Sequence, residues 1–231
     1  MTNISYRCHR FPPEIIQYAV WLYSKFKLSY RDIEDLLAER GLDISYETIR
    51  RWVNKFGADY ARRIRSNRPE ADTTWHLDEM VVVINGRKYW LWRAVDSEGE
   101  MLEFLVQSRR NRRAALRLFR KLLRKQKVQP RTFVTDKLRS YGAALKALQL
   151  DIEHQQGIYQ NNRAENSHLP VRRRERKMQR FKSPRSAQRF LNLHASVYNL
   201  FNIQRHLTTR TTMKLFRTEA MDQWKQVVAV G

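Results

Sequence analysis

The sequence is poor in the features that mark secreted, zinc-binding and membrane proteins. Cys8 is the one cysteine in 231 residues, which excludes an internal disulfide framework and a cysteine-based zinc site. The longest aliphatic run covers residues 81–84, far short of the roughly 20 residues that span a bilayer. Residues 1–7 lack the apolar stretch of a signal peptide. We therefore expect a cytoplasmic protein with no membrane partner.

Acidic residues are also scarce. There are 23 Asp and Glu against 45 Lys and Arg, giving a formal net charge of +22, while 42% hydrophobic residues indicate a folded core. This excess of positive charge favours a polyanionic partner, most simply nucleic acid, with an anionic membrane surface or ribosomal RNA as alternatives.

The basic residues gather in two runs. Residues 109–127 contain ten and no acid, and residues 172–189, which include Arg172 and Arg173, contain nine against Glu175 alone. These runs repel themselves unless an anion such as a phosphate backbone neutralises them.

Residues 1–60 are predicted to form an all-α helix-turn-helix domain. Apolar residues recur at helical spacing, and Ser29, Gly41 and Ser45 suit helix caps, with a stop expected at Gly57. The third helix would present side chains typical of groove reading and phosphate contact: Arg50, Arg51, Asn54 and Lys55. A generic three-helix bundle is the alternative. Residues 61–72 are interpreted as a basic linker.

After residue 73 the hydrophobic period changes from 3.6 to 2. Strands are predicted over 74–84, 87–96 and 101–106, with Asn85-Gly86 forming a tight hairpin turn. A basic amphipathic helix, a strand over 132–135, a second helix and an extended stretch over 151–155 follow, and the chain to about residue 206 reads helical. This order predicts a ribonuclease H-like α/β catalytic domain over 73–207. Residues 208–231 form a tail of unassigned role.

Three carboxylates are candidate metal ligands. Asp78 lies in the middle of a strand, Asp136 follows the end of another, and Glu165 begins a predicted helix. In this fold the first and fourth strands are neighbours, which would bring Asp78 and Asp136 together. Oxygen ligands suit Mg²⁺, and three carboxylates can hold a pair of ions that promote phosphoryl transfer.

Each assignment has a competitor. Asp78 alone could be a surface residue of an edge strand, and Asp136 alone a helix N-cap. Glu79 has the opposite strand parity to Asp78, so we expect only one of the two to join the site. Glu153 and Glu175 compete with Glu165 for the third position.

Several motifs in order give the chain a family resemblance. They are residues 28–33, 38–41 and 48–53 in the first part, then 75–79 (WHLDE), 89–96 (YWLWRAVD), 135–142 (TDKLRSYG) and 161–166 (NNRAEN). With these motifs the chain resembles bacterial insertion-sequence transposases that carry a DDE triad, close to the insertion sequence six family.

The resemblance implies roles for individual residues. Asp78, Asp136 and Glu165 would be the catalytic triad and would bind two Mg²⁺ ions, with Mn²⁺ able to substitute. Arg172, seven residues after Glu165, and Lys137 and Arg139 would contact DNA phosphate. The 29-position interval from Asp136 to Glu165 is shorter than in many relatives.

The implied activity is DNA transposition. A nucleoid-associated homodimer or larger assembly would bind the terminal inverted repeats of its element, free 3′-OH ends and join them to double-stranded target DNA, producing cointegrates. The alternatives are a non-enzymatic helix-turn-helix regulator and a nuclease or resolvase of the same fold.

Overall fold

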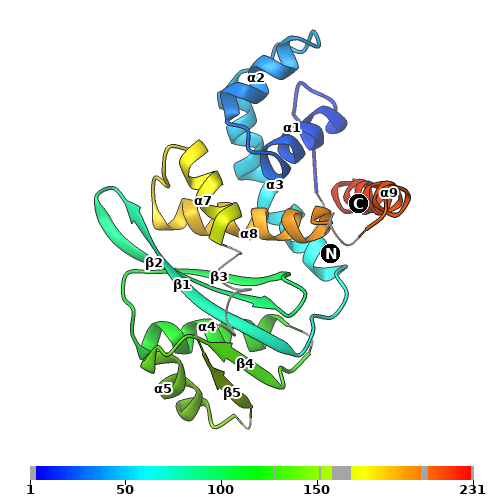
Figure 1. Ribbon diagram of the computed structural model, residues 1–231. Coiled ribbons are helices and arrows are strands. Elements are labelled where there is room, and N and C mark those ends of the chain that lie inside the picture. Colours follow the sequence, from blue (N-terminus) through cyan, green and yellow to red (C-terminus); the bar gives the residue numbers. More distant parts are fainter. Residues whose placement is uncertain (1–3, 127, 151, 158–167, 204–207, 230–231) are drawn as a thin grey trace. The chain divides into compact units, whose positions relative to one another are not determined.

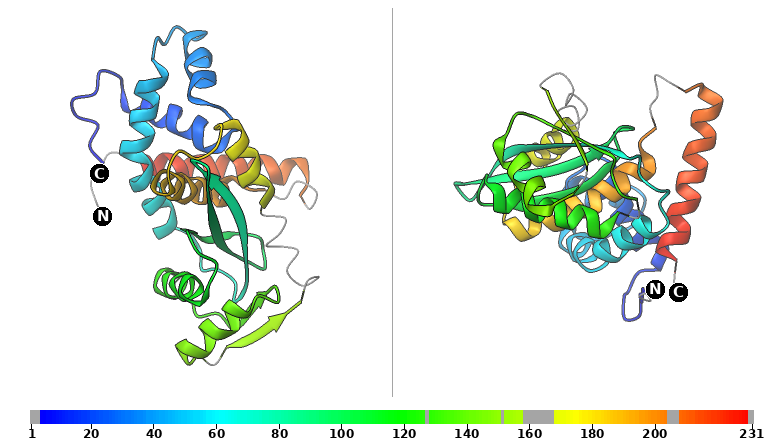
Figure 2. Two further views of the ribbon diagram at one scale, coloured as in Figure 1. Left: turned by 90° about the vertical axis from the view of Figure 1, so that its left-hand side faces the viewer. Right: turned by 90° about the horizontal axis from the view of Figure 1, so that it is seen from below.

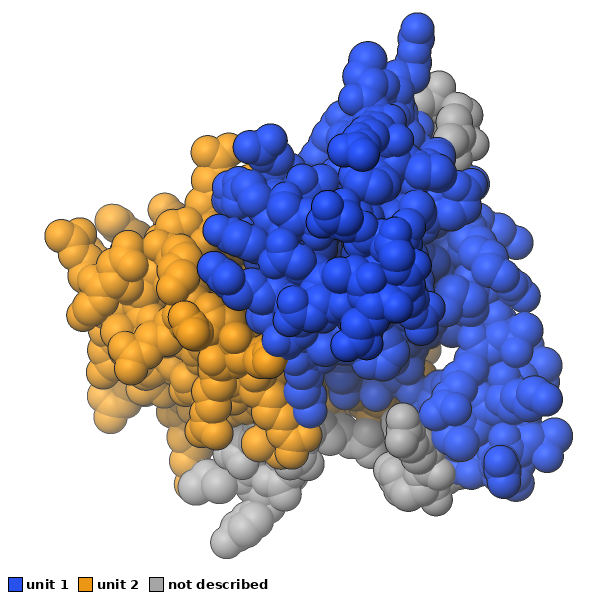
Figure 3. All heavy atoms as spheres, turned by 90° about the horizontal axis from the view of Figure 1, so that it is seen from above, with its two compact units in different colours: residues 1–68, 196–231 blue, residues 69–195 orange. Residues whose placement is uncertain are grey.

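The computed structural model describes residues 4–126, 128–150, 152–157, 168–203 and 208–229. The chain forms two compact units, residues 1–68 with 196–231, and residues 69–195 (Figure 3). No helix in these described ranges is both long and apolar enough to cross a bilayer.

The first unit is built from helices. It contains α1 (Pro13–Lys25), α2 (Tyr30–Ala38), α3 (Tyr46–Ser66), the end of α8 (Pro184–Phe201) and α9 (Arg210–Val228). Its core buries apolar side chains from the first three helices and α9, among them Ile16, Val20, Ile33, Leu37, Ile49, Trp52, Phe56 and Trp224.

The predicted caps of α2 and α3 are confirmed. The Ser29 hydroxyl accepts a hydrogen bond from the Asp32 amide at 3.1 Å, and the Asp32 carboxylate accepts one from the Ser29 amide at 2.8 Å, which forms a capping box. Gly41 ends the α2 segment with φ +74°, where the Leu42 amide bonds the Leu37 carbonyl at 3.0 Å. The Ser45 side chain caps α3. Local sequence therefore determines where these helices begin and turn.

The predicted end of the third helix at Gly57 is wrong, because α3 continues to Ser66. Residues 61–66, expected to begin a linker, are helical. A glycine inside a helix costs only about 1 kcal/mol. Tyr60, beyond that glycine, is buried and packs edge-on against Trp224 at 5.4 Å between ring centroids. Packing against α9 outweighs the local signal to stop.

Residues 208–231, which had no predicted role, belong to this helical unit. Trp224 is 3% exposed and also packs against Phe201, and the Tyr6 hydroxyl donates to the Val228 carbonyl at 2.7 Å. The Arg63 guanidinium donates to the Val227 carbonyl at 2.9 Å. The C-terminal helix is thus part of the core that contains α3.

The second unit contains a five-stranded sheet in the order β3-β2-β1-β4-β5. Its strands are β1 (Thr74–Ile84), β2 (Arg87–Asp96), β3 (Met101–Gln107), β4 (Thr132–Thr135) and β5 (Glu153–Gln156). The first three pair antiparallel, and β4 and β5 extend the sheet in parallel. The predicted ribonuclease H-like order of strands and crossovers is confirmed.

Helices α4 (Arg112–Lys125) and α5 (Arg139–Leu148) cover one face of this sheet (Figures 1 and 2). They bury Phe119 and Tyr141 against the side chains of Trp75, Trp92 and Phe133. Helix α7 (His168–Lys177) and residues 184–195 of α8 complete the unit. The Gln188 side chain bonds the backbone of edge strand β3 at Val106 and Phe104.

We predict that Trp224→Ala destabilises the helical unit by about 3–5 kcal/mol, the usual cost of removing a buried tryptophan. Chemical denaturation followed by far-ultraviolet circular dichroism measures this free energy of unfolding. Gln223→Ala, at the exposed neighbouring position of α9, is the control and should change stability little. Equal effects of the two substitutions would contradict the packing role of α9.

Candidate active site

Adjacent parallel strands bring two of the predicted carboxylates together. In the pairing of β1 with β4, Leu77 lies opposite Thr135, and each is followed at once by an aspartate. Asp78 and Asp136 therefore lie side by side at the end of β4. The predicted neighbourhood of these two residues is confirmed by the strand register.

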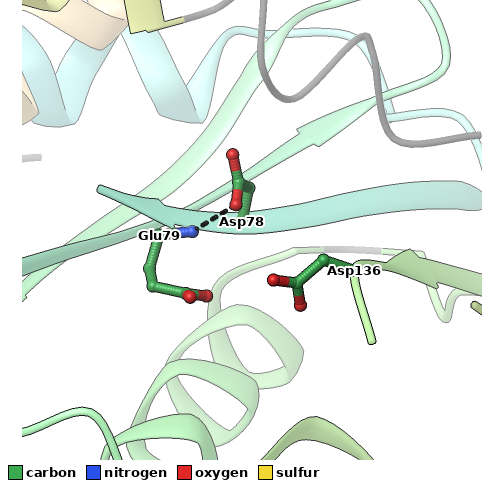
Figure 4. Close-up of side chains that lie close together, drawn as sticks. All are labelled: Asp78, Glu79 and Asp136. Carbon is green, nitrogen blue, oxygen red and sulfur yellow. Dashed lines mark hydrogen bonds between the residues drawn. The ribbon is translucent and has the colours of Figure 1, made fainter. Parts of the chain in front are cut away.

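Glu79 joins them. One carboxylate oxygen from each of Asp78, Glu79 and Asp136 lies within 4.8 Å of the other two. The expectation that only one of Asp78 and Glu79 reaches the site is wrong for this geometry. Asp136 follows the last residue of β4, so side chains from either face of β1 can approach it. Figure 4 shows Glu79 turned toward Asp136 and Asp78 on the other side of the strand.

Asp78 lies between two nitrogen groups on its own face of the sheet. Arg93, directly opposite on β2 and fully buried, donates to Asp78 Oδ2 at 3.3 Å. His168 Nε2, from the first residue of α7, lies 3.0 Å from the same oxygen. Burial alone would raise the pKa of Asp78, but His168 and Arg93 outweigh it, so the pKa lies below its usual value. Asp78 is thus held ionised.

Glu79 has different surroundings on the face that packs against α4 and α5. Its Oε2 accepts a hydrogen bond from the Tyr141 hydroxyl at 2.7 Å, and its Oε1 accepts one from Arg110 Nε at 2.7 Å. Burial raises the pKa of Glu79 to about 7, with the nearby charge of Asp136 acting in the same direction and Tyr141 and Arg110 opposing it.

Asp136 is the most exposed member of the cluster. Its Oδ1 accepts a hydrogen bond from the Leu138 amide at 3.0 Å, and its Oδ2 lies 3.6 Å from Arg110 Nη2. The N-cap residue of α5 is Leu138, so Asp136 is not the helix cap that the alternative interpretation required. Its carboxylate remains accessible beside Asp78.

The third predicted carboxylate, Glu165, lies outside the described residues. Its two competitors are both described, and neither belongs to the cluster. Glu153 is exposed on β5 and accepts a hydrogen bond from the Thr132 hydroxyl at 3.0 Å, while Glu175 pairs with Arg172 within α7 at 3.1 Å. His168, which contacts Asp78, follows Glu165 by three residues.

The predicted phosphate contacts of this unit lie at exposed or half-buried positions. Lys137 and Arg139 are exposed between Asp136 and the first turn of α5. On α7, Arg173 is exposed, and Arg172 is half-buried in its pair with Glu175.

The predicted recognition side chains form an exposed row on α3: Arg50, Arg51, Asn54 and Lys55. Glu47 pairs with Arg50 at 2.5 Å and with Arg51 at 3.7 Å, and Lys55 contacts the His9 ring at 2.8 Å. These contacts leave the row at the surface, so it can meet a ligand.

Sequence reasoning missed Arg110 as a particular member of the site. It lies between β3 and α4, within the first basic run, and its guanidinium contacts both Glu79 and Asp136. The only signal in the sequence was the basic run itself, which does not distinguish Arg110 from Arg109.

The oxygen donors of the cluster suit a hard divalent cation. Asp78 is held ionised and Asp136 is half-buried, whereas burial raises the pKa of Glu79 to about 7 and leaves its side chain only 1% exposed. Asp78 and Asp136 are therefore the members best fitted to hold such an ion, which when bound supplies Lewis-acid activation of oxygen nucleophiles.

Comparison with known proteins gives matches over the same part of the chain. A family model described as a DDE domain matches residues 72–204. The chain is 29% identical over 205 residues to a transposase for the insertion sequence-like element IS431mec of Staphylococcus aureus, covering 87% of this chain and 90% of that protein. The same identity and coverage hold for the transposase of insertion sequence element IS257 in transposon Tn4003 from Staphylococcus aureus.

Solved structures give more distant matches. The HTLV-2 integrase catalytic core domain in complex with magnesium (trimeric form) has a TM-score of 0.40 at 12% identity, covering 62% of this chain and 97% of that chain. A chain of the simian T-cell lymphotropic virus intasome, in complex with PP2A regulatory subunit B56 gamma, has a TM-score of 0.41 at 14% identity over 83% and 75% of the two chains. These two matches carry no information about the reaction that this chain catalyses.

We predict that Tyr141→Phe raises the pKa of Glu79 above about 7. The Tyr141 hydroxyl stabilises the ionised carboxylate, so its removal favours the protonated form. Carbon-13 NMR of the glutamate side chains against pH measures the shift. Tyr89→Phe, half-buried on β2, removes a hydroxyl elsewhere and should leave the titration in place. An unchanged pKa in Tyr141→Phe would show that this bond does not form.

Proposed function

Since this chain belongs to the DDE domain family of insertion-sequence transposases, we propose that it is a Mg²⁺-dependent transposase acting on the ends of its own element. The observation that carries the proposal is the meeting of Asp78 and Asp136 directly after the paired residues of β1 and β4, within the family's domain. Mn²⁺ is expected to replace Mg²⁺.

The third ligand in this proposal is Glu165. In the sequence it lies three positions before His168, whose side chain contacts Asp78. Arg93 and His168 fix the orientation of Asp78 through its Oδ2 atom. The triad would thus consist of one carboxylate held by β2 and α7, one at the end of β4, and one just before α7.

The reaction needs no covalent bond to the protein. In the first step water attacks the phosphorus at the element end and the bond from phosphorus to the 3′ oxygen breaks, which frees a 3′-OH on the element and a 5′-phosphate on the flank. In the second step that 3′-OH attacks a target phosphodiester, and the target 3′ oxygen leaves. One strand is joined at each element end, and we expect cointegrates as products.

The basic residues would hold the DNA during both steps. Lys137 and Arg139 lie directly after Asp136, and Arg172 and Arg173 lie on α7, the helix whose first residue contacts Asp78. Guanidinium groups bind phosphate oxygens through paired N–H donors. These contacts would counter the repulsion between the carboxylates and the phosphate backbone.

Recognition of the terminal inverted repeats is assigned to α3. Its exposed row of Arg50, Arg51, Asn54 and Lys55 offers donors for base edges and phosphates, and α2 precedes it by a short capped turn in the manner of a helix-turn-helix. Two ends must be brought together for joining, so the working form would be a homodimer or larger assembly on double-stranded DNA.

We predict that Asp78→Asn and Asp136→Asn each reduce strand transfer by more than about a hundredfold while end binding is kept. Loss even of a residue that supports a metal ligand costs on the order of 10- to 100-fold. The assay joins labelled terminal-repeat duplex to target DNA in Mg²⁺, and gel shift measures binding.

Glu153→Gln, an exposed carboxylate outside the cluster, is the matched control and should join normally. Joining by Asp78→Asn at the wild-type rate would refute the catalytic assignment. Cutting without joining by the wild type would indicate a nuclease, and binding without either step a regulator.

We predict that Arg51→Ala weakens binding to terminal-repeat DNA by about tenfold, the usual effect of losing one good arginine contact. Arg62→Ala, an exposed arginine further along α3 that pairs with Asp59, removes the same charge outside the recognition row. Fluorescence anisotropy against repeat and random duplexes separates affinity from specificity. Equal losses in the two variants would show that the recognition row is misplaced.

A further inference from the structure

Arg110 is fixed beside the carboxylate cluster by three neighbours. Its Nε and Nη2 lie 2.7 and 2.5 Å from Glu79 Oε1, and its Nη2 lies 3.6 Å from Asp136 Oδ2. Its Cζ lies 5.0 Å from the ring centroid of Trp90, a distance typical of a cation–π contact. These contacts therefore restrict the motion of the guanidinium.

Glu79 is the main restraint on this arginine. The side chain of Glu79 is only 1% exposed, and its two oxygens are bonded to Arg110 and to Tyr141. Mg²⁺ keeps several of its waters when it binds protein carboxylates. A carboxylate whose side chain is 1% exposed leaves little room for the waters of such an ion, and its bonds to Arg110 and Tyr141 are those of a residue that positions an arginine.

Part of the Arg110 side chain remains exposed to solvent. Its side chain is 37% exposed, in contrast to Arg93, which is fully buried against Asp78. A guanidinium has five N–H donors, and the contacts with Glu79 use those on Nε and Nη2. The exposed part thus offers donors to a ligand that approaches Asp136.

We propose that Arg110 binds a DNA phosphate next to the scissile bond, and that Glu79 and Trp90 position it for this contact. The planar fork of arginine matches a phosphate group, and a fork held by a carboxylate and a ring loses little freedom on binding. The inference rests on the proposed function, since it takes the bond cut at Asp78 and Asp136 as its reference point.

The test is a binding experiment that needs no chemistry. Terminal-repeat duplexes carry one uncharged methylphosphonate, placed at each phosphate in turn across the element end, and anisotropy in Ca²⁺ measures their affinity for wild type and Arg110→Gln. We expect Arg110→Gln to weaken binding to the unmodified duplex about tenfold, the size of one charged hydrogen-bonded contact.

The deciding result is coupling at one position. A methylphosphonate adjacent to the scissile phosphate should weaken wild-type binding by a similar factor and weaken Arg110→Gln no further. Arg110→Lys, which keeps the charge but loses the fork, should show an intermediate loss. Glu79→Gln should reduce the coupling, because the guanidinium is then held less firmly.

Arg109→Gln is the matched control. It removes the same charge one residue earlier, where the side chain is exposed and has no ion pair with the residues that the structure describes. It should not couple to the phosphate that couples to Arg110. Thermal unfolding of each variant separates loss of contact from loss of fold.

The outcomes separate this inference from the proposed function. Additive losses for Arg110→Gln at every methylphosphonate position would overturn the Arg110 contact, even if the wild type joins DNA normally. Coupling adjacent to the scissile phosphate in a protein that fails to join ends would support the contact and contradict the proposed strand transfer.

Discussion

The parallel pairing of β1 with β4 is the interaction on which the site depends. Strand β4 has only four residues, and its register beside β1 places Asp136 one position past Thr135, level with Asp78. That register is held by packing, because Phe133 of β4 contacts Trp75 of β1 and Phe119 of α4 at 5.8 and 4.9 Å between ring centroids. An aromatic core on one face of the sheet thus fixes the spacing of the two carboxylates that follow the paired residues of β1 and β4.

Asp78 and Glu79 lie on opposite faces of β1 and have different charged neighbours. On one face Arg93 and His168 hold Asp78 ionised. On the other, Glu79 lies between Tyr141 and Arg110 with its pKa raised to about 7. A fully buried arginine such as Arg93 is tolerated only when its charge is paired. Neighbouring acids on one strand therefore take separate roles, one suited to a cation and the other to an arginine at the surface.

Much of this arrangement follows from the sequence. Alternation of apolar residues and the Asn85-Gly86 turn predict β1 and β2 with the observed ends, and Ser29 and Gly41 predict both ends of α2. The passage of α3 through Gly57 was missed because it depends on Trp224, far away in the sequence. The alternation of side chains along β1 predicted the correct face for Glu79, but it did not show that Asp136 can be approached from both faces of that strand. The role of Glu165 remains a prediction, as it lies outside the described residues.

We infer that Asp78 and Asp136 hold a divalent cation between them. Electron paramagnetic resonance of Mn²⁺, titrated into the protein bound to terminal-repeat DNA, tests it without reference to turnover. We expect Asp78→Asn and Asp136→Asn each to abolish the tightest Mn²⁺ site and Glu79→Gln to keep it. Retention of that site in either aspartate variant, or its loss in Glu79→Gln alone, would show that these two aspartates do not hold the ion.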